Sequence, residues 1–159
     1  MYHKTQLDST EYTDKMRFAC VLAAYIKRRS NLVMLAEKKE NIDVDELSLA
    51  IKESLGFLSL TGAECAFDCA VSGKIHGKNA GVFYDFFEAC IANYDVLPSA
   101  VIVRISRCGN NFVLRIECDN KAEEISEKIK SKFEKYDVTI QTDDEEVYYS
   151  LTLPEGGAV

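Results

Sequence analysis

The sequence has no long apolar run, and its first residues are polar. No stretch approaches the roughly 20 apolar residues that a helix needs to span a bilayer. Residues 1–6 lack the apolar core of a signal peptide. Hydrophobic residues make up 47% of the chain and charged residues 28%, which is the balance of a globular protein in water. We therefore expect a cytoplasmic domain that makes no membrane contact of its own.

Basic residues are too few to form a nucleic-acid surface. The formal net charge is −7, with 19 lysine and arginine residues against 26 aspartate and glutamate residues. Binding to a phosphate backbone needs clustered basic side chains that release counterions. The only dense basic cluster, residues 27–29, lies within a helical pattern and is interpreted as a solvated helix face. No nucleic-acid partner is expected.

Histidine is scarce, and the six cysteines lack the spacing of metal ligands. The chain has two histidines, and Cys65 and Cys69 are not separated by the two residues of a zinc-binding pair. The cysteines mostly occupy apolar, regularly patterned segments, which is typical of buried free thiols in a cytosolic protein. The sequence predicts neither a metal site nor a disulfide framework.

Proline and glycine are absent from residues 11–39, and this segment is predicted to be one long helix. Two apolar stripes run along it at three- and four-residue spacing. The first stripe contains Tyr12, Met16, Ala19, Ala23, Ile26 and Val33, and the second contains Phe18, Leu22, Tyr25, Leu32 and Leu35. Two stripes indicate a helix that is covered from two sides, as in a four-helix bundle. Because a hairpin supplies only one covering neighbour, we expect a second copy of the chain to supply the other.

A second helix is predicted to start at Asp43 and to end before Gly62. Asp43 followed by Glu46 is a start signal, and glycine is common just after a helix ends. Between them, apolar residues recur at helical spacing at Leu47, Ile51, Leu55 and Leu58. Residues 11–61 then form a helical hairpin with a short polar connection, through which the chain is expected to form a homodimer. Residues 1–62 make up this first domain.

The second predicted domain, residues 63–159, mixes strand and helix patterns. A short strand lies within residues 66–75, a helix covers 79–94, strands cover 100–106 and 111–118, a charged helix covers 121–135, and a last strand pair covers 138–141 and 147–153. Strands joined mostly by hairpin turns, with helices on one face, form a two-layer α/β sandwich. The predicted fold class is therefore α+β, a two-helix hairpin followed by such a sandwich.

This order of elements resembles the cytoplasmic core of bacterial sensor histidine kinases. In that family a helical hairpin dimerises as a four-helix bundle and precedes an ATPase domain of the GHKL type. The resemblance covers essentially the whole chain in topology. It implies a role in two-component signal transduction, a response regulator as partner, and a membrane-attached receptor to which such a core is joined.

The family's N box pairs an acidic residue with an asparagine four positions later, and the two help to hold Mg²⁺-ATP. One helical turn separates these positions, so both side chains face the same pocket. The resemblance places Asp85 on the acidic position and Ala89 on the asparagine, with Glu88 on the same helix. Alanine cannot coordinate a metal ion. Asn93, one turn further on, would substitute only if the helix were shifted.

The family's Asp-x-Gly-x-Gly motif, whose aspartate accepts a hydrogen bond from adenine, has only a remnant here. Strand parity puts Cys118 on the aspartate position, whereas sequence similarity favours Asp119 and Asn120. Both glycines and the second glycine-rich loop are absent, and without them the backbone cannot easily cradle phosphates. Asp119 and Asn120 are also suited to cap the helix that follows.

The hairpin has no histidine to accept a phosphoryl group. In one subgroup of the family the acceptor lies six positions after an arginine, and counting from Arg17 leads to Ala23. His3 precedes the helix, and His76 lies in a turn outside the hairpin. No catalytic residue is therefore assigned, and the enzymatic activity is left open.

Three functions are compatible with these residues. The leading hypothesis is a histidine kinase-like signal-transduction core with weak or lost nucleotide binding, in which the nucleotide-facing residues are Asp85, Glu88, Asn93, Asp119 and Asn120. The second is an active but diverged ATP-dependent protein kinase, and the third is a non-enzymatic interaction module like the anti-sigma-factor relatives of this fold. ATP and Mg²⁺ are the expected cofactors if activity is retained, and none is expected otherwise.

Overall fold

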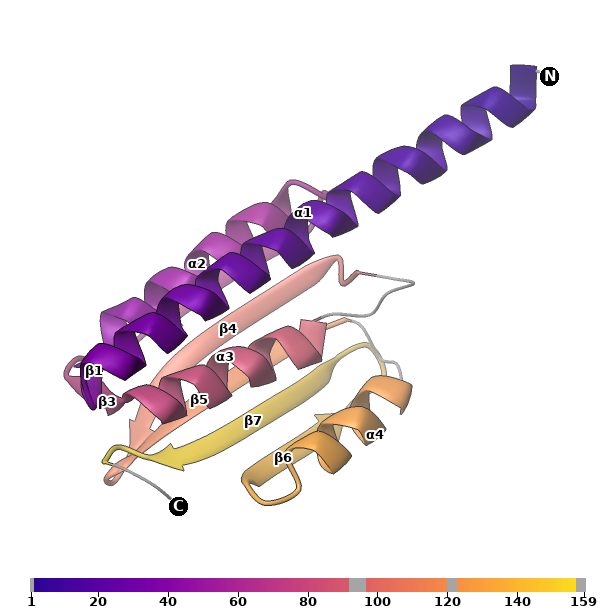
Figure 1. Cartoon of the computed structure of the whole chain (residues 1–159). Helices are drawn as coiled ribbons and strands as arrows, with labels where there is room; N and C mark the ends of the chain where they lie inside the picture. The colour runs from indigo at the N-terminus through magenta and orange to yellow at the C-terminus, as the bar shows by residue number, and fades with distance from the viewer. Residues whose placement is uncertain (1, 92–96, 120–122, 157–159) are drawn as a thin grey trace.

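The protein is described by a computed structural model that covers residues 2–91, 97–119 and 123–156. Figure 1 shows the helices packed over a twisted sheet. In chain order the elements are α1 (Tyr2–Lys38), β1 (Asn41–Asp43), α2 (Val44–Ser59), β2 (Glu64–Cys69), β3 (Lys74–His76), α3 (Gly77–Ile91), β4 (Ala100–Cys108), β5 (Asn111–Cys118), α4 (Glu123–Lys132), β6 (Asp137–Thr142) and β7 (Val147–Pro154).

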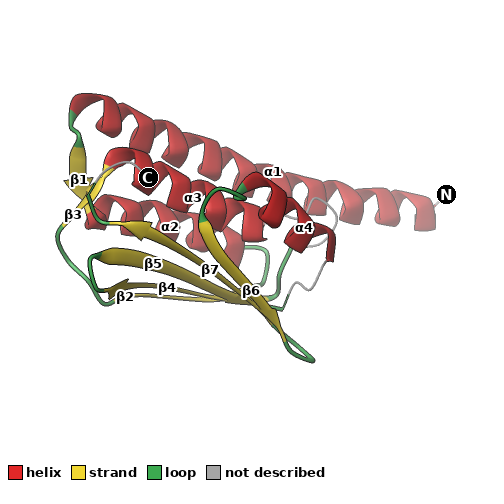
Figure 2. Ribbon diagram, turned by 90° about the horizontal axis from the view of Figure 1, so that it is seen from below, coloured by secondary structure: helices red, strands yellow, loops and turns green. Residues whose placement is uncertain are grey.

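The main sheet has five strands in the order β2-β4-β5-β7-β6. Strands β2 and β4 are parallel, and every other neighbouring pair is antiparallel. Gly109, at φ +62°, closes the β4–β5 hairpin in the left-handed conformation that glycine adopts without strain. The helices lie on one face of this sheet and leave the other face open (Figure 2).

Strand alternation separates these two faces. Every second residue of the central strands is buried beneath the helices, at Val101, Val103, Ile105, Phe112, Leu114, Ile116, Cys118, Val147, Tyr149, Leu151 and Leu153. Their sequence neighbours point to the open face, as the period of two in a strand requires. One continuous hydrophobic cluster joins these residues to the buried side chains of α2, α3 and α4.

Helix α1 forms an outer layer, because it packs on α2 and α3 rather than on the main sheet. Leu32 is buried, and Tyr25 and Leu35 pack against the core. The amino-terminal part of α1 extends beyond the rest of the protein (Figure 1). Its carboxy-terminal end lies so close to α3 that a Cβ atom on Gly77 would be 2.7 Å from the Cβ of Ala36.

The two apolar stripes of α1 have different environments. The second stripe faces α2 and α3, as expected for the inner side of a hairpin. The first stripe is exposed to solvent, with exposed fractions of 66% for Tyr12, 48% for Met16, 55% for Ile26 and 38% for Val33. One apolar face of α1 is thus covered within the chain, and the opposite face is not.

A two-stranded sheet of β1 and β3 was not predicted. It is antiparallel and fastens the α1–α2 connection to the segment before α3. The backbone N–H of Val44 also donates a hydrogen bond to the carbonyl oxygen of Gly73, over 2.9 Å. Three-residue strands are too short to give a period in the sequence. The segment expected to be a polar connection therefore contains the unpredicted strand β1. The segment expected to hold one strand, residues 66–75, contributes to two strands, β2 and β3.

The predicted α+β class, the helical hairpin and the sandwich are confirmed. Asp43 caps α2 as expected, since its carboxylate accepts a hydrogen bond from the backbone N–H of Asp45 over 2.9 Å. The boundary between residues 62 and 63 stays a prediction, and α2 contacts β2 and α1 contacts α3 across it. All six cysteines are free, but only Cys90 and Cys118 are fully buried. Within the described residues, no helix is long and apolar enough to cross a membrane.

Candidate functional site

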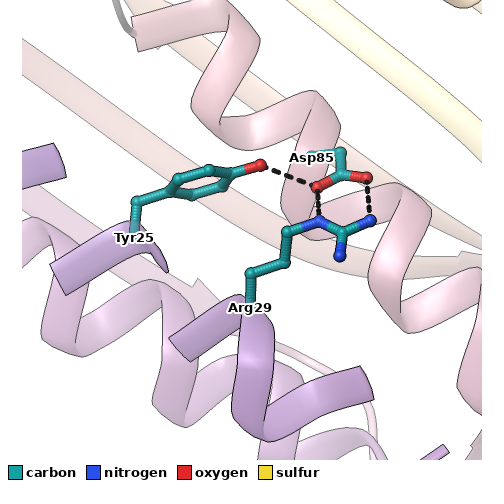
Figure 3. A network of polar contacts seen from close by, with 3 residues as sticks. All are labelled: Tyr25, Arg29 and Asp85. Atoms are coloured by element: carbon teal, nitrogen blue, oxygen red, sulfur yellow. Dashed lines mark hydrogen bonds and ion pairs between the residues drawn. The ribbon is translucent and has the colours of Figure 1, made fainter. Parts of the chain in front are cut away.

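The residue that resembles the acidic N-box position, Asp85, is tied to helix α1. Its Oδ1 atom accepts hydrogen bonds from the Tyr25 hydroxyl at 2.8 Å and from Arg29 Nε at 2.6 Å. Its Oδ2 atom accepts a third from Arg29 Nη2 at 3.1 Å. Figure 3 shows both side chains reaching from α1 to the carboxylate on α3. Both oxygens of Asp85 are therefore engaged within the protein.

Electrostatics reinforce this cluster of Tyr25, Arg29 and Asp85, which we call the α1–α3 latch. Burial, followed by the hydrogen bond to Asp85, raises the pKa of Tyr25 and keeps its hydroxyl a donor. The hydrogen bond to Asp85 also raises the pKa of Arg29. The Tyr25 ring stacks on Tyr84 of α3, with ring centroids 5.3 Å apart. Polar and aromatic contacts thus hold α1 against α3.

A second ion pair and a buried hydrogen bond extend this interface to α2. Arg28 pairs with Glu53 of α2. The hydroxyl groups of Ser54 and Tyr84 are hydrogen bonded at 2.5 Å. Burial raises the pKa of Tyr84 to about 12, so this hydroxyl group is not ionised at neutral pH. Polar contacts, as well as apolar packing, therefore connect the three helices.

Glu88 lies on the same helix but does not form a joint ligand set with Asp85. It lines a small, mostly apolar cavity together with Phe87, Ile91 and Leu97. Burial raises the pKa of Glu88, Lys132 opposes that rise, and the negative charge of Asp85 adds to it. Glu88 therefore faces mostly apolar side chains, and it belongs to no group of three or more potential metal ligands among the described residues.

Aromatic and aliphatic side chains fill the space between α3 and α4. The rings of Phe86 and Phe133 meet edge to face, with centroids 5.3 Å apart. Cys90 of α3 and Ile125 and Ile129 of α4 are buried. Asn93 and Asn120, two of the residues assigned to nucleotide binding, lie outside the described residues. In the described part, α3 and α4 pack directly on each other.

Asp119 is engaged at the start of β4. Its Oδ1 accepts hydrogen bonds from the backbone N–H groups of Ser99 at 3.0 Å and Ala100 at 3.2 Å, and its Oδ2 accepts one from the Ser99 hydroxyl. Burial alone would raise the pKa of Asp119, but these hydrogen bonds together lower it. The carboxylate therefore joins the end of β5 to the beginning of β4, and its role as an adenine contact stays a prediction.

Among the described residues, no set of ligands for Mg²⁺-ATP, the cofactor that the resemblance implies, comes together. They contain no group of three or more histidine, cysteine, aspartate or glutamate side chains arranged to hold a metal ion. Glycines at positive φ occur in this part of the chain at Gly62, Gly73 and Gly109, in the α2–β2, β2–β3 and β4–β5 connections. A phosphate cradle needs such glycines or a free helix terminus beside the site.

The sequence matches no protein-family model and no curated protein. The fold, in contrast, is shared with solved histidine kinases. The kinase domain of a blue-light-activated histidine kinase from Erythrobacter litoralis aligns with 84% of this chain and 81% of its own length, at 12% identity and a TM-score of 0.56. Histidine kinase AdeS from Acinetobacter baumannii aligns with 98% and 84%, at 13% identity and a TM-score of 0.53. The chain has the histidine kinase fold.

A third structure with this fold is the complex of histidine kinase ThkA with the response regulator TrrA. It aligns with 82% of this chain at 9% identity and a TM-score of 0.51. This chain spans 48% of the ThkA chain in that complex. Identities this low establish the architecture only.

Within the histidine kinase fold, the latch is a feature of the site that the sequence did not predict. Residues 27–29 were interpreted as a solvated face, and this is wrong for Arg28 and Arg29, which pair with α2 and α3. Tyr25 was assigned to the inner stripe, and its apolar ring does lie there, but its hydroxyl reaches a carboxylate 60 residues away. A spacing rule within one helix cannot find such a long-range partner.

Breaking the latch is expected to loosen α1. Asp85→Asn and Arg29→Gln should each lower the free energy of unfolding, with a coupling of about 1 kcal/mol in a double-mutant cycle. This value is modest because the Arg29 side chain is 43% exposed and is screened by water. Urea denaturation measures it. Lys15→Gln in the exposed Glu11–Lys15 pair is the control, with no measurable effect expected. A coupling near zero for Asp85 and Arg29 would contradict a structural latch.

Proposed function

We propose that this protein is a signal-transduction domain of the histidine kinase fold that acts through protein contacts rather than by ATP-dependent phosphotransfer. The observation that carries the proposal is the packing of α3 on α4, where Phe86 meets Phe133. Phosphoryl transfer depends on positioning the nucleotide and neutralising its charge. Between α3 and α4, the described residues instead make an apolar contact.

The acceptor histidine that the family uses is also missing from the predicted hairpin, residues 11–61. The expectation that His3 precedes the helix is wrong, because α1 begins at Tyr2 and therefore includes His3. His76, at the end of β3, has a mostly buried side chain, whose Nδ1 atom accepts a hydrogen bond from the Lys78 backbone N–H at 3.3 Å. This arrangement is consistent with a structural role. The loss of the reaction therefore does not rest on one substitution alone.

The protein contacts that we propose begin with a homodimer through α1. The exposed stripe alternates in steps of four and three residues from Tyr12 through Met16, Ala19, Ala23, Ile26 and Ser30 to Val33. This seven-residue repeat is the pattern by which two helices pair along their length. A self-complementary stripe favours a second copy of the chain, because a twofold axis brings identical residues together. The second stripe of α1 is already covered by α2 and α3, which leaves the first stripe for the proposed dimer contact.

A response regulator is the second proposed partner. The support is the solved complex of ThkA with a response regulator, whose kinase shares the fold of this chain. A domain that dimerises and binds a response regulator can transmit a signal without performing the phosphorylation. The interaction would then control the availability of the regulator.

The proposed function is tested by incubating the purified protein with γ-³²P-labelled ATP and Mg²⁺, beside an active histidine kinase as the positive control. We expect no acid-labile or acid-stable label on this chain, with or without a response regulator. Label that accumulates with time, and is lost with Asp85→Asn, would show that the second hypothesis, an active diverged kinase, is correct.

A further inference from the structure

The open face of the main sheet carries two arginines directly opposite each other. Arg104 of β4 and Arg115 of β5 are cross-strand partners. The same row continues to Ser150 of β7 and Thr139 of β6, because Arg115 pairs with Ser150 and Thr139 pairs with Ser150. A hollow of about 380 Å³ lies over this row, and these four residues line it. The hollow is of the size that small ligands occupy.

These two arginines differ from others in the protein. Arg28, Arg29 and Arg107 form ion pairs with Glu53, Asp85 and Glu155. In the part of the chain that the structure describes, neither Arg104 nor Arg115 has a hydrogen bond or an ion pair. Like charges directly opposite in a sheet destabilise it.

Among the described residues, two carboxylates lie near the row without forming ion pairs with its arginines. Asp68 of β2 is in register with Arg104 at the end of the row, but forms no ion pair with it. Glu117 lines the hollow beside Arg115, and a hydrogen bond between its side chain and that of Glu146, followed by burial, raises the pKa of Glu117, whereas the positive charge of Arg104 lowers it. Within the described residues, Glu117 forms no ion pair with either arginine.

We propose that Arg104, Arg115, Ser150 and Thr139 form a binding site for the phosphate group of a small phosphomonoester. Two guanidinium groups supply fork-shaped donors that match phosphate oxygens in pairs, and the two hydroxyl groups add single donors. A bound dianion removes the repulsion between the arginines. The site lies on the face of the sheet opposite to α3 and α4, so it is independent of the family's nucleotide site.

Phosphate titrations followed by NMR of the arginine Nε–H groups test this site. The probes are inorganic phosphate and glucose 6-phosphate, each compared with sodium chloride at equal ionic strength. We expect saturable shifts of the Arg104 and Arg115 signals at millimolar concentrations of both phosphates. Arg104→Gln and Arg115→Gln should each weaken binding at least about tenfold. Arg115→Lys should restore part of it, because it keeps the charge without the fork.

Lys128→Gln is the matched control, since it removes one positive charge from an exposed position on α4. It should leave phosphate binding unchanged. Without ligand, Arg104→Gln and Arg115→Gln should raise the melting temperature by about 1–3 °C, because each removes the like-charge pair. Shifts no larger than those in sodium chloride, or equal weakening by Lys128→Gln, would overturn the proposal. Binding of inorganic phosphate but not glucose 6-phosphate would overturn the phosphomonoester assignment.

Discussion

Replacing Phe86 with alanine is expected to lower the free energy of unfolding by about 3–5 kcal/mol. Phe86 is fully buried, and it is the α3 side of the contact with Phe133. Removing the ring loses the free energy gained by burying it. It also leaves a cavity, because the two helices cannot move close enough together to fill the space. Urea denaturation followed by circular dichroism measures this loss. Phe133→Ala should have an effect of similar size, and the two should be strongly non-additive because they share one contact.

Phe57→Ala provides the control for this pair. It makes the same substitution on α2, where the side chain is 41% exposed, and we expect a loss below about 1 kcal/mol. Equal small effects at Phe86 and Phe57 would mean that the space between α3 and α4 is open in solution. That outcome would restore a nucleotide site as a possibility in this fold.

A glutamate at Ile26 is expected to convert the protein from a dimer to a monomer. In the dimer that we propose, Ile26 lies in the middle of the exposed stripe of α1, where a twofold axis would bring the two copies of this residue close together. Two facing carboxylates would then have to be buried without partners, at a cost of several kcal/mol. Sedimentation equilibrium should give twice the 17.9 kDa of one chain for the original protein, and the mass of one chain for the variant.

Leu49→Glu is the control for the dimer. Leu49 lies on α2 and is 48% exposed, the same fraction as Met16 of the stripe, but it is not part of the repeat. It should leave the mass of the dimer unchanged, whereas Met16→Glu should dissociate it as Ile26→Glu does. A monomeric original protein, or a dimer that Leu49→Glu breaks and Ile26→Glu does not, would contradict pairing through α1.

Regular patterns made most of the fold predictable. The strands from residue 100 onward show a period of two with turn residues between them, and the helices show apolar repeats with an N-cap at Asp43. The short sheet of β1 and β3 carries no such pattern, because three residues are fewer than the repeat that would reveal them. Its existence depends on contacts between residues far apart in the sequence, such as Ile42 with Ile75.

The candidate site was only partly predictable for a related reason. The sequence itself shows that the family's glycines are missing and that Ala89 stands at the asparagine position. Both differences concern residues that the family's chemistry requires. The partners of Asp85 could not be read, because Tyr25 and Arg29 belong to another helix and reach it only after α1 packs on α3. The filling of the space between α3 and α4 likewise depends on tertiary packing.

In the function that we propose, α3 and α4 pack together and leave no room for a nucleotide. An amide-resolved NMR titration with ATP and Mg²⁺ tests it directly, because it separates this place from the open face of the sheet. We predict that signals from α3 and α4 stay unchanged at millimolar nucleotide, even where signals near Arg104 and Arg115 move. Saturable shifts of the Phe86 and Phe87 amides on α3, together with amides of α4, would contradict the claim.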